Sequence, residues 1–266
     1  MPCRYRRIAA PIIAVGLLCL TPAAASAQAD IEAVWSFSGG QVAVQAGGDG
    51  TFTGTVIRET TLANCPHPVG EQMWVAVRAQ PDGQYWGGHQ WYRDLGCEPI
   101  VERGNTAFRQ LSRPDGGRFL RVCFSPPESP DVQPSIAPDG SSTGSPGSCL
   151  DSDLVSALPT GKPKVEQIAT LPTQGKRRCL SRRSFKIRLK EPKGDALRSA
   201  EVFLNGKRIQ VRTGERLTAT INLRGVPKGR YTVKIVAKTV LGDTIQGKRR
   251  YRTCATKRRG SNRSPV

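Results

Sequence analysis

Residues 231–238 read Tyr-Thr-Val-Lys-Ile-Val-Ala-Lys, a pattern typical of an all-β protein. Apolar residues stand at every second position, at Tyr231, Val233, Ile235 and Ala237, and most positions between them are polar or basic. Successive side chains of a strand point to opposite faces, so this two-residue period predicts a β-strand with one buried and one exposed face.

The same period recurs on both sides of this strand. Five more strands are expected, at residues 184–190, 200–204, 209–211, 217–223 and 244–254. Asn205-Gly206 lies between two of them and is a strong signal for a two-residue hairpin turn. Residues 176–255 are therefore expected to form a second, all-β domain, followed by a basic, disordered tail at 256–266.

The segment Val226-Pro227-Lys228-Gly229-Arg230-Tyr231 resembles the late-strand signature of fibronectin type III and related bacterial immunoglobulin-like modules. The resemblance implies an immunoglobulin-like sandwich in which Tyr231 fills the tyrosine-corner role. Cys179 and Cys254 depart from the family pattern, because they bracket the domain instead of bridging its two sheets. The family implies binding or spacing and names no ligand.

The first domain, residues 28–158, is also expected to be all-β. Strand-length runs at 41–46, 51–58, 72–79, 84–92, 106–112 and 117–124 are separated by glycine-rich turns, which predicts a small antiparallel barrel or sandwich. Trp35 and Arg121 resemble the Trp and Arg that pack together at the closed end of lipocalin-like barrels. That likeness favours a barrel.

Two segments are expected to lack regular structure. Residues 125–148 hold six Pro, seven Ser and three Gly, so they are interpreted as a loop that buries nothing. Residues 159–175, with Pro and Gly at intervals, are interpreted as the linker between the domains.

The amino terminus has the order of a secretory signal. Arg4, Arg6 and Arg7 precede an apolar run that is too short to span a bilayer, and Ala25-Ser26-Ala27 is an A-x-A cleavage site. We expect residues 1–27 to be removed and the mature protein to be secreted or held in the cell envelope, outside the cytoplasm. No later apolar run is long enough to cross a membrane.

Six cysteines remain after the signal, and an even count in an exported chain indicates disulfides. Their positions favour three pairs: Cys65 with Cys97, Cys123 with Cys149, and Cys179 with Cys254. A zinc site would need closely spaced thiolates with histidines, and the chain has two histidines. Neither a metal nor a cofactor is therefore expected.

Catalytic motifs fail on their context. Ser142 lies in a G-x-S-x-G string, but that string falls within the Pro/Ser/Gly segment and not between a strand and a helix. Residues 242–248 approach the phosphate-loop spacing but place Arg249 where Ser or Thr must bind magnesium. Asp151 and Asp153 lack the glycine and glutamate of a calcium loop.

The sequence does not exclude a pair of catalytic carboxylates, for example Glu71 with Asp94 or Glu98, because it does not show whether these groups are close in space.

Aromatic residues gather at 85–92. On a strand, Tyr85, His89 and Trp91 share one side, and Trp86 and Tyr92 share the other. One side faces the core, and the other is either covered by the proline-rich loop or free to stack on a sugar ring or line a ligand pocket.

The two halves of the chain carry net charges of opposite sign. Residues 28–175 carry 10 basic and 16 acidic residues, whereas residues 176–266 carry 27 basic and 5 acidic residues. Such a block attracts polyanions. The candidate polyanion-binding residues are those expected to project from strand faces or to extend the charge beyond them: Lys186, Arg188, Lys190, Lys234, Lys238, Arg249, Arg250 and Arg252.

The sequence therefore favours an exported, non-enzymatic binding or adhesion protein whose basic domain attaches to an anionic cell-envelope polymer or polysaccharide. Nucleic acid would match the charge, but the aromatic rings and the cations lie in different domains, which disfavours it. The alternative is a small secreted hydrolase that acts on cell-wall or extracellular polysaccharide, with the basic domain as its targeting module.

Overall fold

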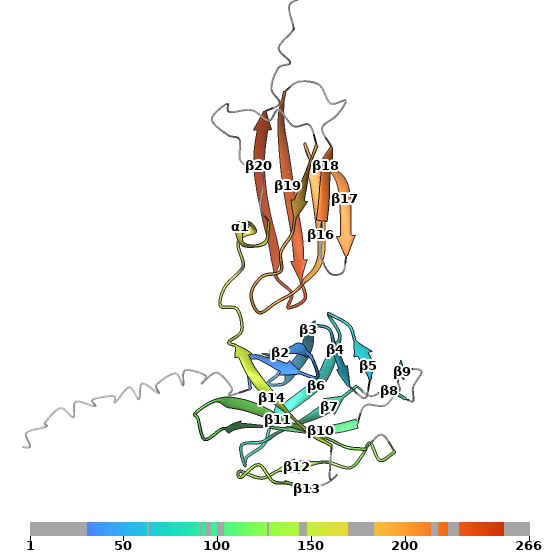
Figure 1. Cartoon of the computed structure of the whole chain (residues 1–266), viewed down its shortest axis with the longest axis vertical. Helices are drawn as coiled ribbons and strands as arrows, with labels where there is room; N and C mark the ends of the chain where they lie inside the picture. Colours follow the sequence, from blue (N-terminus) through green and yellow to red (C-terminus); the bar gives the residue numbers. More distant parts are fainter. Residues whose placement is uncertain are drawn as a thin grey trace, which may run out of the picture.

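The computed structural model describes residues 31–62, 64–90, 92–93, 97–99, 104–126, 128–143, 148–169, 184–213, 218–222 and 229–252. The expected signal at 1–27, Cys179, Cys254 and the expected basic tail at 256–266 lie outside these ranges. Nearly all regular structure is β-strand, as expected. A closed barrel and a second unit, residues 165–252, are stacked along the long axis of the molecule (Figure 1).

Eight strands close into the antiparallel barrel, and each is hydrogen-bonded to the barrel strand that follows it along the chain, until the last pairs with the first. They are β1 (Val34–Phe37), β2 (Gly40–Ala46), β3 (Phe52–Arg58), β6 (Gln72–Ala79), β7 (Tyr85–His89), β10 (Gly104–Ser112), β11 (Arg118–Phe124) and β14 (Cys149–Ser156). Closure removes sheet edges, which explains how so many short strands coexist without an exposed pairing surface.

Alternation decides which side chains fill the barrel. On β11, Leu120, Val122 and Phe124 belong to the interior cluster, and Arg121 projects outward between them. Trp35 is wholly buried in the same cluster. Burying a large apolar side chain contributes about 1.5–3 kcal/mol, so this packed interior is the main source of barrel stability.

The lipocalin-like pairing of Trp35 with Arg121 is not formed. Trp35 lies inside the barrel, where its Nε1 donates to the carbonyl of Ile31 at 2.9 Å. Arg121 lies outside, where Nε and Nη2 each donate to the Asp151 carboxylate at 2.7 Å, and this hydrogen bonding raises the pKa of Arg121. Strand parity places the two residues on opposite sides of the wall, so the residue likeness does not hold, although the barrel that it favoured is present.

Three two-stranded sheets lie outside the barrel sheet in the described part of the first unit. They pair β4 (Thr60–Leu62) with β5 (Cys65–His67), β8 (Tyr92–Arg93) with β9 (Glu98–Pro99), and β12 (Ser135–Ile136) with β13 (Ser142–Thr143). Disulfides join Cys65 to Cys97 and Cys123 to Cys149, the two pairs favoured from the sequence for this part of the chain.

The Pro/Ser/Gly segment at 125–148 is not a loop that buries nothing. Ile136 is buried against Ala107 and Cys123 on the outer wall. Arg109 Nε donates to the carbonyl of Ile136 at 2.7 Å, and the amide of Ile136 donates to Gln84 Oε1 at 3.1 Å. One isoleucine, side-chain hydrogen bonds and backbone hydrogen bonds such as that from the amide of Asn105 to the carbonyl of Pro130 therefore hold this segment on the barrel despite its low apolar content.

The second unit contains a four-stranded sheet in the order β17-β16-β19-β20 and a separate pair, β15-β18. The bounds are β15 (Ser184–Arg188), β16 (Leu197–Leu204), β17 (Lys207–Thr213), β18 (Thr218–Asn222), β19 (Arg230–Thr239) and β20 (Thr244–Arg252). Ile187 of β15 shares one core cluster with Val233 and Ile235 of β19, so the two sheets bury their inner faces together.

The hairpin between β16 and β17 turns at Asn205 and Gly206, as expected. Their φ angles are 49° and 83°, the left-handed region that asparagine and glycine tolerate. Asn205 Oδ1 also accepts a hydrogen bond from the amide of Thr232 at 2.8 Å, which ties the turn to β19.

Part of the expected linker is packed structure. The short helix α1 (Val165–Ile168) places Val165 and Ile168 in the core of the second unit, and Ala169 forms a bridge with Leu189. Val165 lies directly against the backbone of Gly247 on β20, where a Cβ atom would collide with it. The segment that joins the units therefore ends before residue 165.

An apolar contact joins the barrel to the second unit. Val34, Ala43 and Ile57 on the barrel wall form one buried cluster with Ala196. Asp195 supports this contact, because its Oδ1 accepts hydrogen bonds from the amides of Ala196 at 2.7 Å and of Leu241 at 3.2 Å. Burial raises the pKa of Asp195, although hydrogen bonds from Thr239 and from these amides oppose the rise.

Candidate anion-binding surface

The outer face of β19 and β20 carries a row of exposed cations. Tyr231, Val233, Ile235 and Ala237 are buried on the inner face of β19, so the residues between them face outward. The two strands lie side by side along the second unit (Figure 1). Six exposed residues form the cationic strip: Arg230, Lys234 and Lys238 on β19, with Lys248, Arg250 and Arg252 on β20.

Register places like charges opposite each other within the strip. Arg230 is the cross-strand partner of Arg252, and Lys234 is the partner of Lys248. Cβ atoms of directly opposed residues are about 5 Å apart, and like charges there are destabilising. Repulsion between these like charges therefore lowers the stability of the isolated protein, and a bound anion would reduce that repulsion.

Acidic neighbours are scarce on this face. Among the described strand residues of the four-stranded sheet, the acid is Glu201 on β16, and Arg208 Nη1 donates to its Oε1 at 3.0 Å. Glu201 is the cross-strand partner of Val236, so it lies diagonally beside Lys234 and Lys238, whereas β19 separates it from the β20 half of the strip. No ion pair found in the described part of the chain joins the strip to an acid of the barrel.

The structure divides the basic residues named from the sequence. Lys234, Lys238, Arg250 and Arg252 all belong to the cationic strip. Arg188 and Lys190 are exposed, but they follow the inward residues Ile187 and Leu189 of the other sheet and so face away from the strip. The side chain of Lys186 lies outside the described part of the structure.

Arg249 does not project outward. Its cross-strand partner is Val233, which is wholly buried, so Arg249 lies on the core-facing side of β20, two residues from Tyr251. Burial raises the pKa of Tyr251, and the charge of Arg249 and its hydrogen bond oppose that rise. The sequence named Arg249 among the residues that extend the positive charge, and the register now places it on the opposite face from the cationic strip.

Two members of the strip were missed from the sequence, Arg230 and Lys248. The signal that identifies them is parity: Arg230 precedes the inward Tyr231, and Lys248 is four residues from Arg252 on the same face.

The described members of the aromatic set at 85–92 are divided between the barrel interior and its outer wall. Tyr85 and His89 are buried, and His89 packs edge-on against Phe124 at 4.6 Å between ring centroids. Trp86 is 37% exposed on the outer wall. The side chains of Trp91 and Tyr92 lie outside the described residues, so Trp86 is the described member of the set that a surface ligand can touch.

The carboxylate Glu71 lies beside a histidine. His67 Nδ1 is 3.1 Å from Glu71 Oε1, and the His67 side chain is fully buried. Glu98 is exposed on β9, and Asp94 is outside the described residues. Ser142 is an exposed residue of the short strand β13, and the next described element after it is the strand β14, not a helix.

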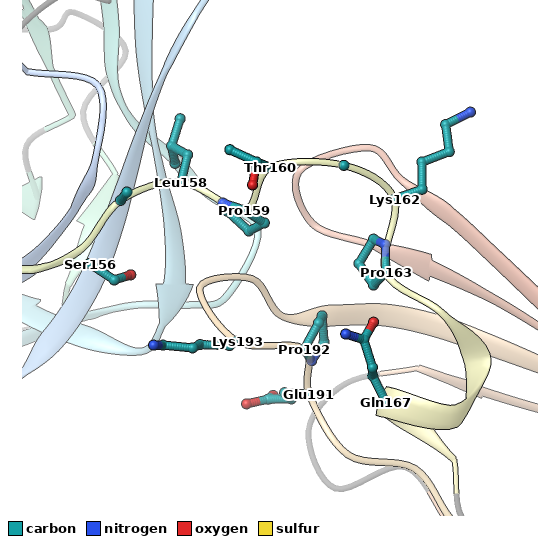
Figure 2. A pocket seen from close by; sticks show the side chains of 12 residues that line it. Ser156, Leu158, Pro159, Thr160, Lys162, Pro163, Gln167, Glu191, Pro192 and Lys193 are labelled. Atoms are coloured by element: carbon teal, nitrogen blue, oxygen red, sulfur yellow. The ribbon is translucent and has the colours of Figure 1, made fainter.

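Two cavities lie at the junction of barrel and second unit, with volumes of about 660 Å³ and about 300 Å³. Both are lined by Ser156 and by Glu191, Pro192 and Lys193. In Figure 2, Lys193 reaches from its loop toward the barrel strands. No aromatic ring lines either cavity, and the cations of the strip are elsewhere. About half of each lining is polar, and Asp195 in the smaller cavity is held by the amides of Ala196 and Leu241.

Within the described ranges, no helix is both long and apolar enough to cross a bilayer. The same residues contain no cluster of three or more His, Cys, Asp or Glu side chains arranged to hold a metal ion.

Comparison with known proteins identifies no family. No family profile matches this chain, and no curated protein matches it. Among solved structures, the fibronectin(III)-like modules of Clostridium thermocellum CbhA match with a TM-score of 0.26 and 9% identity, over 65% of this chain and 86% of that one.

A second solved structure is the extracellular domain of a putative hybrid two-component system from B. thetaiotaomicron, with a TM-score of 0.25 and 13% identity. That match covers 82% of this chain and 36% of the other, so this chain spans about a third of its length. At these TM-scores neither likeness supports a statement about the fold or the function of this chain.

Proposed function

We propose that this protein is an exported, non-enzymatic binding protein that attaches to anionic polymers of the cell envelope through its cationic strip. In this proposal residues 1–27 are a cleaved signal and the second unit is an immunoglobulin-like module. The first unit, which the sequence delimits at residue 158, presents a separate surface to ligands.

One observation carries the proposal: the strip pairs like charges across two neighbouring strands. Arg230 lies opposite Arg252 and Lys234 lies opposite Lys248, and every one of these side chains is exposed. A protein of this charge gains solubility from cations anywhere on its surface, so solubility alone does not favour direct opposition. A linear polyanion lying along the two strands offsets the repulsion at each rung.

Two further features support export. Disulfides join Cys65 to Cys97 and Cys123 to Cys149, and disulfides persist in oxidising compartments. The basic, apolar and small-residue order of residues 1–27 is typical of a secretory signal.

The test is retention of the mature chain, residues 28–266, on purified cell envelope and on a heparin-like resin. Neutralising Lys234, Lys238 and Lys248 to Gln is expected to reduce retention strongly, because three cations of the strip are lost. Changing Arg188 to Gln on the opposite sheet is the matched control and is expected to have little effect. Equal retention of the strip variant and the wild type would refute the proposal.

A further inference from the structure

The end of the cationic strip far from the barrel differs chemically from the rest. Its three cations are all arginines, Arg230, Arg250 and Arg252, here named the arginine cluster. Arg230 is the cross-strand partner of Arg252, and Arg250 is the partner of Thr232 on the same outward face. Opposed Cβ atoms are about 5 Å apart and diagonal ones about 7–8 Å, so the three guanidinium groups reach a common volume.

The remaining cations are lysines. Lys234 and Lys248 form the middle rung, and Lys238 lies next to Thr239 at the end of β19. That end is close to the barrel, because the amide of Val240 donates to the carbonyl of Ala196 at 2.8 Å and Ala196 belongs to the junction cluster. β19 and β20 run from the junction to the distal end of the second unit (Figure 1). Their register places the lysines of the strip toward the junction and its arginines at the distal end.

Arginine and lysine recognise anions differently. Lysine is a compact point charge that attracts any anion, whereas arginine offers a planar fork of donors. One such fork pairs with both oxygens of a planar carboxylate, and further guanidinium groups must then approach in the plane of the carboxylate, where its remaining lone pairs lie. The tetrahedral oxygens of a phosphate ester accept hydrogen bonds from several forks in different planes, so a cluster of three arginines favours phosphate over carboxylate.

We propose that the arginine cluster is a phosphate-binding subsite, which makes a polymer of phosphate esters the preferred ligand of the strip. The inference rests on the proposed function, since it names the chemical class of the polymer that the strip binds. The lysine part supplies attraction that does not depend on the anion, and the cluster supplies the selectivity. The polymer lies along β19 and β20 with a phosphate at the distal end.

The experiment measures binding of the mature chain to three probes of equal charge: poly(glycerol phosphate), oligothymidylate and polyglutamate. The wild type is expected to bind both phosphodiesters about three- to tenfold more tightly than polyglutamate. Changing Arg230, Arg250 and Arg252 together to Lys keeps the charge. This variant is expected to lose the phosphate preference while its affinity for polyglutamate stays within about twofold.

The change of Arg188 to Lys, on the opposite sheet, is the matched control and is expected to keep the preference. Thermal unfolding of the triple variant checks that the sheet is intact.

The possible results separate the two claims. If the wild type binds none of the probes, the proposed function fails. If it binds all three equally, the strip binds polyanions but the cluster is not a phosphate subsite. A preference that survives the triple Arg-to-Lys change also overturns the inference, as does a preference for only one of the two phosphodiesters, because the phosphate group is common to both.

Discussion

Changing Lys234 to Gln should stabilise the isolated protein and weaken its binding to polyanions. Lys234 and Lys248 are directly opposed on exposed positions of β19 and β20. Repulsion between like charges at such a site costs about 0.2–1 kcal/mol. Because both side chains reach into water, screening brings the expected gain to the lower half of that range.

The two single changes should not add. Changing Lys234 to Gln removes the repulsion from Lys248, and changing Lys248 to Gln removes the same repulsion. The double variant should therefore be less stable than the sum of the two single gains predicts, by a coupling energy of about 0.3–0.5 kcal/mol. A gain of this size raises the melting temperature by roughly 1–2 °C for a protein of this length.

The assay is urea unfolding of the wild type, both single variants and the double variant at low salt and near 1 M salt. At 1 M salt the Debye length falls to about 3 Å, so the coupling should disappear. A coupling energy of zero at low salt, or one that high salt leaves unchanged, would refute the account of Lys234 and Lys248 as directly opposed like charges. A stabilised variant that binds polyanions as tightly as the wild type would refute its function.

Three further predictions concern the scaffold. Changing Asp195 to Ala should lower the unfolding free energy by about 2–4 kcal/mol, because buried amides lose their acceptor; Asp195 to Asn should lower it less. Burial raises the pKa of Asp195, so the wild type should lose stability as pH rises from the ordinary pKa of a carboxyl group to the raised one. The Asn variant cannot ionise, so urea unfolding across the same pH range should show no such loss. Changing Gly247 to Val should destabilise the second unit by about 1–3 kcal/mol through collision with Val165, and changing Val165 to Ala in the same chain should restore part of the loss; no loss from the first change would contradict the packing of the helix. Changing Cys123 and Cys149 together to Ala should cost about 3–4 kcal/mol for a bridge that spans 26 residues, measured against the oxidised wild type; an unchanged urea midpoint would show that the bridge contributes nothing.

Strands were the most predictable feature of this chain. In the second unit the two-residue period of apolar residues is uninterrupted from Tyr231 to Ala237, and one buried face leaves little freedom in register. The Asn205-Gly206 turn was equally clear, because few residues tolerate left-handed backbone at two successive positions.

Tertiary packing accounts for what the sequence did not predict. Ile136 is a single apolar residue in a segment rich in Pro, Ser and Gly, and composition cannot show that the barrel wall provides a place to bury it. The four residues of α1 are too few for helical periodicity to be visible. Arg121 was paired with Trp35 on likeness, although the parity of β11 sends Arg121 outward.

The binding surface was predicted in part for the same reason. Residues 248–250 are all basic, so composition alone does not tell which of them face outward. The pairing of Tyr231 with Tyr251 fixes the parity, placing Arg249 inward and Lys248 outward. The charge of the second unit was evident from the sequence, but its gathering on one face required the register.

The salt dependence of binding to a phosphodiester polymer tests the central claim most directly. If all six cations of the strip engage a flexible single chain, the logarithm of the association constant should fall against the logarithm of salt concentration with a slope of about −4. Neutralising Lys234 and Lys248 should make the slope shallower by about 1.4, whereas neutralising Arg188 should leave it unchanged. A slope near zero for the wild type, or equal slopes for the strip variant and the wild type, would contradict the account.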